Sequence, residues 1–282
     1  MSCNAYPEPF MPRAQVLVIT GYGTNCERET AHAARIAGAD SVTVAHFADL
    51  IQESIRISDF NFLIFPGGFL DGDHLGGAQA AASRYTYLPT RNGGFLLDDL
   101  RALIDRGGLI LGICNGFQLL VKLGLLPALP EASQQRQVSL SFNDSARFED
   151  RWVNLVRNPR CGSVFLSGLE RLYLPVRHGE GKLIARDDAI LDAIQSNNLI
   201  ALQYADANGD PTQTYPENPN GSPLAIAGLC DPSGRILGLM PHPEAYNHPT
   251  NHPGWTRGET GLLGTSILEN GMRSIQQGKS IA

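Results

Sequence analysis

Short apolar runs alternate with longer amphipathic segments through the first half of the chain. Buried strands are predicted from length and from apolar, β-branched composition at four places: 15–20, 41–46, 61–65 and 109–113. Thr24 or Asn25 can cap a helix that runs through Ile36. A second helix is predicted over 96–105. Strands that alternate with helices and are apolar on both faces predict a parallel sheet that is covered on both sides.

The second half has a different pattern. Strands are predicted without long helices between them, at 148–156, 172–176 and 199–204. Two further runs, 224–229 and 235–240, flank the turn sequence Asp-Pro-Ser-Gly and predict an antiparallel hairpin. We therefore expect an α/β fold with a mostly parallel central sheet flanked by helices, followed by antiparallel strands.

No change of composition and no internal repeat marks a linker. We expect one domain over residues 1–282, with a proline-containing N-terminal tail (1–13) and a C-terminal extension (246–282) that holds a helix over 261–276. The N-terminus lacks the apolar core of a signal peptide. No stretch approaches the roughly 20 apolar residues of a membrane span, so no membrane association is expected.

Composition and charge indicate which class of protein this is and which partners are excluded. A hydrophobic content of 43% and a charged content of 18% are ordinary for a soluble globular protein. The net charge of −6, with no run of Lys or Arg, argues against nucleic-acid binding. Five scattered cysteines without CxxC or Cys/His ligand spacing suggest neither a disulfide framework nor a metal site. Reduced thiols in a cytoplasmic protein are the simpler interpretation.

The richest motif surrounds Cys114, between an apolar run and an amphipathic one. Gly112 and Gly116 permit a tight strand-to-helix turn with the cysteine at its corner, as in the nucleophile elbow of hydrolases. At a helix N-terminus the unpaired N–H groups and the helix dipole favour a thiolate. The alternative, an inert core thiol, has no use for two flanking glycines.

A base and its orienting carboxylate are predicted at His242 and Glu244. Residues two apart on an extended segment point the same way, and Pro241 and Pro243 stiffen that geometry. His242 can accept the thiol proton while Glu244 holds the other ring nitrogen. Alone, this motif is also compatible with a surface turn and an incidental ion pair. Together with the cysteine elbow it predicts a Cys-His-Glu triad for acyl transfer from an amide.

Other residues are candidates for substrate contacts. Gly67 and Gly68 follow a buried strand, and their N–H groups with that of Asn115 can form an oxyanion hole. A tight structural turn is the alternative, and a phosphate loop is excluded because no Gly-Lys-Ser/Thr follows. Gln118, four residues after the cysteine, can bind a substrate amide or face solvent. His178 follows another strand and is a candidate for the same pocket.

The remaining cysteine and histidine motifs are assigned structural roles. Cys26 also follows a strand, but no glycine follows it and no partner histidine is evident. His74, His248 and His252 are expected in loops, because no carboxylate or thiol keeps ligand spacing with them. No metal ligand is therefore predicted in the chain.

These motifs together resemble those of class I (triad) glutamine amidotransferases, and more narrowly those of the glutaminase subunit of phosphoribosylformylglycinamidine (FGAM) synthase. The triad motifs specify the superfamily. Four further stretches match the narrower pattern: 23–27 (Gly-Thr-Asn-Cys-Glu), 66–69 (Pro-Gly-Gly-Phe), 178–181 (His-Gly-Glu-Gly) and 218–222 (Asn-Pro-Asn-Gly-Ser). The resemblance implies a flavodoxin-like fold and hydrolysis of L-glutamine through a γ-glutamyl thioester on Cys114.

The resemblance also implies partners. Ammonia would pass to a large ATP-dependent synthetase subunit, often with a small third protein, in purine biosynthesis. ATP and Mg²⁺ are expected on that partner, and no cofactor is expected in this chain. Two departures from the family pattern are the extension after 246 and the long segment 71–94, in which 85–92 resembles an insertion. The competing hypotheses are a stand-alone flavodoxin-like cysteine hydrolase, an amidotransferase for another acceptor, and a non-catalytic module with a vestigial triad.

Overall fold

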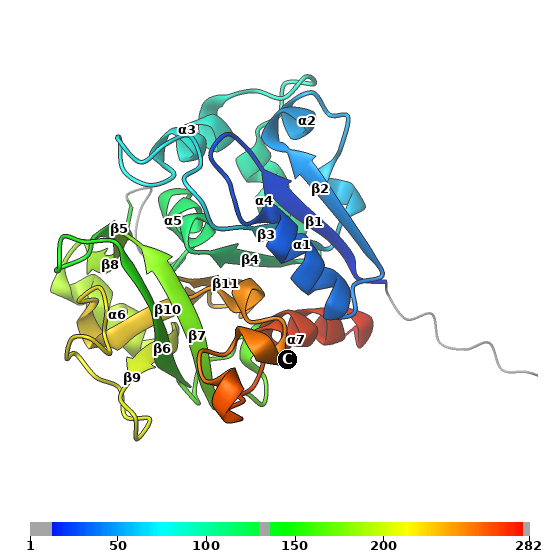
Figure 1. The fold of residues 1–282 in the computed structure, drawn as a ribbon. Coiled ribbons are helices and arrows are strands. Elements are labelled where there is room, and N and C mark those ends of the chain that lie inside the picture. Colours follow the sequence, from blue (N-terminus) through cyan, green and yellow to red (C-terminus); the bar gives the residue numbers. More distant parts are fainter. Residues whose placement is uncertain (1–12, 130–135, 279–282) are drawn as a thin grey trace, which may run out of the picture.

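A nine-stranded sheet runs through the computed structural model (Figure 1), which describes residues 13–129 and 136–278. The strand order is β2(Ser41–His46), β1(Gln15–Thr20), β3(Phe62–Phe65), β4(Leu109–Ile113), β11(Ile236–Leu239), β10(Ile226–Cys230), β9(Ile200–Ala205), β6(Glu149–Arg157), β7(Arg171–His178). The five strands from β2 to β11 are parallel, and the pairings from β11 to β7 are antiparallel. The predicted change from parallel to antiparallel strands and the predicted β10–β11 hairpin are confirmed.

Helices cover both faces of the parallel strands. They are α1(Glu27–Ile36), α2(Phe47–Ile51), α3(Gln79–Tyr87), α4(Leu96–Asp105), α5(Asn115–Lys122) and α7(Thr265–Gln276). Phe62 and Phe65 of β3 point to opposite faces because side chains alternate along a strand. Phe62 packs against Gly271 of α7, and Phe65 packs against Gly116 of α5. Figure 1 shows α1 and α7 side by side, so these two helices share one face.

A second, two-stranded sheet pairs β5(Val138–Phe142) with β8(Glu180–Ala185). The helix α6(Asp188–Ser196) follows β8 and was not predicted. Its signal was nevertheless present in the sequence, because the Asp187 side chain accepts a hydrogen bond from Ile190 N (2.9 Å) as an N-cap. Short 3₁₀ turns complete the described chain at Ile57–Asp59, Val164–Leu166, Pro223–Ala225, Pro243–Ala245, Pro249–Asn251 and Trp255–Arg257.

The start of α1 differs from the prediction. Its N-cap is Cys26, without a side-chain cap, rather than Thr24 or Asn25. The N–H groups of Asn25 and Cys26 both donate to Gly67 O (3.4 Å each), so a tertiary contact with the turn after β3 sets the entry into the helix. This contact brings Cys26 next to the site described below.

The C-terminal extension is part of the core as far as it is described. In α7, the Asn270 side chain donates to the carbonyls of Phe165 (3.0 Å) and Ser167 (2.8 Å). In the segment 71–94, helix α3 buries Tyr85 completely, against Phe47 and Phe65. Residues 1–12 of the predicted tail and residues 279–282 of the extension lie outside the described residues. Among the described helices, none has the length and apolar character needed to span a membrane.

Candidate active site

The chemistry-bearing residues meet at the carboxyl ends of three adjacent strands, β3, β4 and β11. Ligands of parallel sheets bind at this edge. A cavity of about 270 Å³ lies there, lined by Asn25, Cys26, Glu29, Gly68, Phe69, Asp73, Cys114, Gln118, Phe148, Arg177, His178, Gly179, Glu180 and His242. The sequence places these residues far apart, and the parallel pairing of β3 with β4 and of β4 with β11 brings their loops together.

Cys114 occupies the corner between β4 and α5. Its backbone (φ 51°, ψ −103°) lies in the left-handed half of the conformational map, where side chains other than hydrogen are strained. The flanking glycines are required by close packing: a Cβ on Gly112 would lie 2.6 Å from Leu120 Cδ1, and one on Gly116 would lie 2.0 Å from Phe65 O. The thiol sits at the N-cap of α5, is 5% exposed, and its Sγ lies 3.7 Å from Arg177 O.

His242 and Glu244 follow β11 and are buried together. His242 Nδ1 and Glu244 Oε1 are 2.7 Å apart, while His242 Nε2 has no hydrogen-bond partner among the described residues. Burial opposes charge on the ring, but Glu244 and then the Cys114 and Cys26 thiols outweigh burial and hold the pKa of His242 well above its ordinary value. Gly67 makes room for this ring, because a Cβ there would lie 2.7 Å from His242 Cε1.

The candidate oxyanion donors lie on either side of the thiol. Gly68 lines the cavity, and its φ of +142° and the backbone atoms 2.8 Å from a hypothetical Cβ admit only glycine. In the turn around Gly68, the N–H groups of Asn25 and Cys26 donate to Gly67 O, and Phe69 N donates to Gly23 O. These bonds do not use the N–H group of Gly68. Asn115 is the first residue of α5, where N–H groups have no partner within the helix.

Gln118 reaches the cavity, but both ends of its side-chain amide are engaged within the protein. Its Nε2 donates to Glu180 O (2.7 Å), and its Oε1 accepts from Asn115 Nδ2 (2.8 Å). The bond to Glu180 holds α5 against β8, and the bond from Asn115 fixes the amide orientation within α5. A direct contact between Gln118 and a substrate therefore stays a prediction.

His178 lies at the end of β7 with one nitrogen anchored. Its Nδ1 is 3.0 Å from Asn143 Oδ1, which also accepts from Gly181 N, so Nδ1 is the protonated nitrogen and Nε2 is an acceptor. The Nε2 atom has no partner among the described residues. Burial, and then the charge of His242, lowers the pKa of His178 to about 3, so the ring stays neutral.

Cys26 was predicted to be a structural thiol without a partner histidine. The structure instead places it in the cavity beside His242, as the N-cap of α1. Burial raises the pKa of Cys26, and the contact with His242 partly offsets this effect. The sequence carried no local signal for this contact, because it depends on the turn at Gly67 that lies under both side chains.

The motif at 218–222 forms hydrogen bonds with β8 and β9, next to the site but outside the cavity. Asn220 Nδ2 donates to Gly181 O (2.9 Å) and to Tyr204 Oη (3.0 Å), and Leu183 N donates to Ser222 Oγ (3.0 Å). None of these residues lines the cavity. The prediction from sequence missed Asn143, whose amide bonds the carbonyl and the ring of the same histidine, His178. Its position in a loop after a half-buried strand gave no sign of this role.

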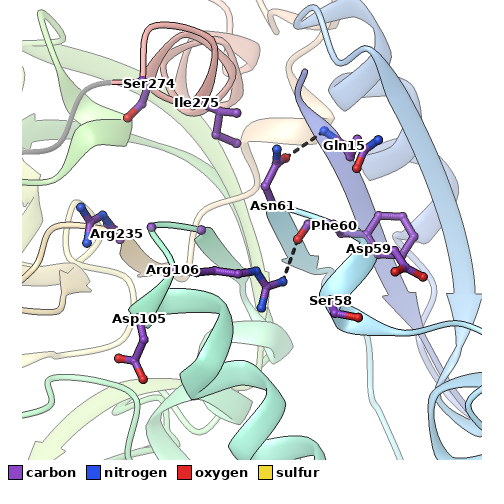
Figure 2. Close-up of a pocket in the computed structure, with 13 residues that line it drawn as sticks. Gln15, Ser58, Asp59, Phe60, Asn61, Asp105, Arg106, Arg235, Ser274 and Ile275 are labelled. Atoms are coloured by element: carbon purple, nitrogen blue, oxygen red, sulfur yellow. Dashed lines mark hydrogen bonds between the residues drawn. The ribbon is translucent and has the colours of Figure 1, made fainter. Parts of the chain in front are cut away.

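A second cavity and the remaining histidines lie outside the candidate active site. A cavity of about 600 Å³ at the opposite edge of the sheet contains none of the predicted site residues (Figure 2). Its polar side chains join neighbouring loops: Asn61 Oδ1 accepts from Gln15 N (2.9 Å), and Arg106 donates to Phe60 O (2.9 Å). The His252 ring packs against the rings of Trp152, Tyr173 and Tyr246 at tilted angles. His74 and His248 lie in loops, as predicted.

Comparisons with known proteins agree with the geometry. Residues 13–273 match a family model described as a CobB/CobQ-like glutamine amidotransferase domain. The chain is 42% identical over 241 residues to "phosphoribosylformylglycinamidine synthase subunit PurQ" of Methanococcus maripaludis, covering 85% of each chain. It is 40% identical to the PurQ subunit of Dehalococcoides mccartyi, covering 87% of this chain and 90% of that one.

A solved structure is similar as well. The chain superimposes on a chain of the structure of PurLQS from Thermotoga maritima with a TM-score of 0.68 and 26% identity, covering 94% of this chain and 100% of that one. The resemblance inferred from the motifs is confirmed by the matching family and relatives. This chain belongs to the CobB/CobQ-like glutamine amidotransferase family.

Proposed function

We propose that this chain hydrolyses L-glutamine and supplies the ammonia to the synthetase of FGAM synthase, in de novo purine biosynthesis. The observation that carries the proposal is the arrangement in the cavity. A thiol at a helix N-terminus and the unpartnered Nε2 of His242 face one space, and Glu244 fixes the other ring nitrogen. The PurQ relatives and the PurLQS structure supply the acceptor reaction.

The reaction runs through a thioester. The Cys114 thiolate attacks the side-chain carboxamide carbon of glutamine, and the N–H groups of Gly68 and Asn115 hold the developing oxyanion. His242, charged and held by Glu244, protonates the leaving nitrogen, and ammonia departs. Water then cleaves the γ-glutamyl thioester, releasing glutamate and restoring the thiol.

The remaining residues position the substrate. The neutral His178 offers Nε2 as an acceptor for a substrate N–H group, and Gly67 leaves room for the His242 ring. Gln118 keeps α5 in place and borders the substrate.

The partners follow from the relatives. A large synthetase subunit with its own ATP and Mg²⁺ receives the ammonia, and a small third subunit takes part, as the PurLQS name indicates. No cofactor or metal is needed on this chain for glutamine hydrolysis. The cytoplasm is the proposed location, because free thiols stay reduced there.

Covalent labelling with a glutamine-mimicking electrophile tests the proposal. Peptide mapping is expected to find one adduct, on Cys114, that excess glutamine blocks. Labelling of Cys114 only after addition of the synthetase would also support the proposal and would indicate that docking activates the site. An adduct on Cys26 instead, no protection by glutamine, or cleavage of peptides without preference for glutamine would contradict it.

A further inference from the structure

Two carboxylates line the cavity without a cationic partner. Asp73 lies in the segment before α3, and Glu180 begins β8. Asp73 Oδ1 is buried, and no described residue bonds it. The Glu180 side chain is buried as well, and its Oε2 accepts from Gly77 N (3.0 Å), whereas no described residue bonds its Oε1. Within residues 13–129 and 136–278, no Lys or Arg forms an ion pair with either carboxylate.

The two carboxylates disfavour each other's charge. Burial, and then the charge of Glu180, raises the pKa of Asp73. Lys122 offsets this effect only in part, and its Nζ donates to Gly77 O rather than to a carboxylate. A cationic group bound between the two carboxylates would stabilise both charges and would satisfy the buried oxygen of Asp73.

A separate observation also points to a ligand in this cavity. The side chain of His178 is 3% exposed and lines the cavity, and its Nε2 has no partner among the described residues. Buried polar atoms in native proteins are nearly always hydrogen-bonded. The cavity therefore has unpaired acceptors of two kinds, a neutral nitrogen and carboxylate oxygens, and a ligand that fits both carries an N–H group and a cation.

Glu180 lies about one helical turn from the thiol. Gln118 follows Cys114 by four residues, a rise of about 6 Å along α5, and its Nε2 donates to Glu180 O (2.7 Å). Gly77 packs on the same amide, because a Cβ there would lie 2.4 Å from Gln118 Oε1. In glutamine, four bonds of about 1.5 Å separate the carboxamide carbon from the α-nitrogen, which is about 5 Å when extended. A glutamine whose carboxamide lies at Cys114 therefore has the length to bring its α-ammonium group to the carboxylates.

We infer that Asp73 and Glu180 bind the α-ammonium group of the substrate and so restrict the site to free α-amino acids. This inference rests on the proposed function and names the part of the substrate that the site selects. An ammonium group has three N–H donors, and its hydrogen bonds to carboxylates are charge-assisted. A glutamine within a peptide chain has an uncharged amide at this position and is rejected. Neither carboxylate takes part in proton transfer at the thiol, so both are specificity residues.

The test compares glutamine with glutaramate, which has the same carboxamide but no α-amino group, as substrates of the complete holoenzyme. Release of glutamate or glutarate, read by mass spectrometry while the synthetase reaction runs, gives kcat/KM for each. In the wild type we expect kcat/KM to be at least about tenfold lower for glutaramate, as for the loss of a charge-assisted hydrogen bond.

The variants assign this preference to the two carboxylates. Asp73→Asn should lower kcat/KM for glutamine about tenfold and change that for glutaramate by less than about threefold. Glu180→Gln, which keeps an acceptor for Gly77 N, should act in the same way. The control Asp71→Asn makes the same change in the same loop but outside the cavity, where Asp71 pairs with Arg84. It should leave the ratio of the two kcat/KM values unchanged.

Equal hydrolysis of the two amides by the wild type would overturn the inference, because the site would then not recognise the ammonium group. This comparison needs no variant, so it also covers the case in which a variant fails to fold. Equal losses for both amides in Asp73→Asn and Glu180→Gln would overturn it too, since the carboxylates would then have only a structural role. A wild-type holoenzyme that hydrolyses neither amide but still uses added ammonium salt would instead contradict the proposed function, and the inference with it.

Discussion

Two histidines in one cavity are held in opposite charge states. His242 is favoured as an imidazolium by Glu244 and the thiols, whereas His178 is kept neutral by burial and by the charge of His242. The difference arises from their partners, because Nδ1 of His242 faces a carboxylate and Nδ1 of His178 faces a neutral amide. One ring can therefore give a proton while the other accepts a hydrogen bond.

The neutral state of His178 makes stability depend on pH. Its pKa is lowered from 6.5 to about 3 on folding, so the unfolded chain binds the extra proton between these values. The contribution of His178 to the free energy of unfolding is therefore fully present above pH 6.5. It is lost as the pH falls towards 3, by up to about 1.4 kcal/mol per pH unit.

We expect His178→Gln, which cannot titrate, to lose less stability than the wild-type chain on acidification. Urea unfolding of both chains from pH 7.5 to 4.5 measures this, and the difference in free energy of unfolding should shrink or reverse as the pH falls. A difference that stays constant over this range would show that His178 is not held neutral.

The role of Cys114 gives a second prediction. Cys114→Ala should reduce glutamine-dependent FGAM synthesis by the complete holoenzyme to background, because no thioester can form. Synthesis from added ammonium salt should persist, since the synthetase is untouched. If both activities are lost, Cys114 serves docking or structure instead.

Residues with local signals were predictable from the sequence. Cys114 carries flanking glycines, and the flanking prolines of His242 mark a stiffened turn. Cys26 and Asn143 were not recognised, because their contacts with His242 and His178 join segments far apart in the sequence. No pattern within a window of neighbouring residues can report such contacts.

At the scale of elements, apolar runs predicted the strands of the sheet to within one or two residues. Two short helices were not predicted from the sequence. The helix α2 has only five residues, and α3 lies within the segment 71–94, for which no helix was predicted. The nine-residue α6 was missed as well, although Asp187 caps it. Helix starts that depend on tertiary contacts, such as that of α1 at Gly67, cannot be read from capping residues alone.

The seating of α7 gives an element-scale prediction. A Cβ on Gly271 would lie 2.9 Å from the Phe62 ring and 3.0 Å from the Phe165 ring. Helix propensity favours Leu over Gly by about 1 kcal/mol, but overpacking costs about 1–3 kcal/mol. We expect Gly271→Leu to lower the free energy of unfolding by up to about 2 kcal/mol, measured by thermal unfolding.

The exposed helix end offers the matched control, Gln277→Ala, which should change stability by less than about 0.5 kcal/mol. A Gly271→Leu chain more stable than the wild type would show that α7 does not pack against Phe62 and Phe165 as described.

At the scale of the whole molecule, one sheet joins the two halves. The parallel strands present Cys114 and His242, and the antiparallel strands bring His178 to the same cavity. The sequence predicted both halves of this sheet, but not that β11 would pair with β4 and so place the histidine beside the thiol. Strand order depends on packing across the whole chain.

The strained corner at Cys114 has a consequence for stability. A residue at φ 51° and ψ −103° costs about 1–3 kcal/mol unless it is glycine, while glycine elsewhere costs about 0.5–1 kcal/mol relative to Ala. We expect Cys114→Gly to be more stable than Cys114→Ala by about 1 kcal/mol, measured by urea unfolding. Equal stabilities, or a less stable glycine variant, would mean that the corner is not strained.

At position 114, the residue that gives the more stable fold differs from the residue that supplies the thiol. A population selected only for a folded chain would drift towards glycine at 114, because the backbone there relaxes without a side chain. A population selected for chemistry must keep the thiol and accept a lower melting temperature. On the proposed function, a cysteine at this corner favours reactivity at the expense of stability.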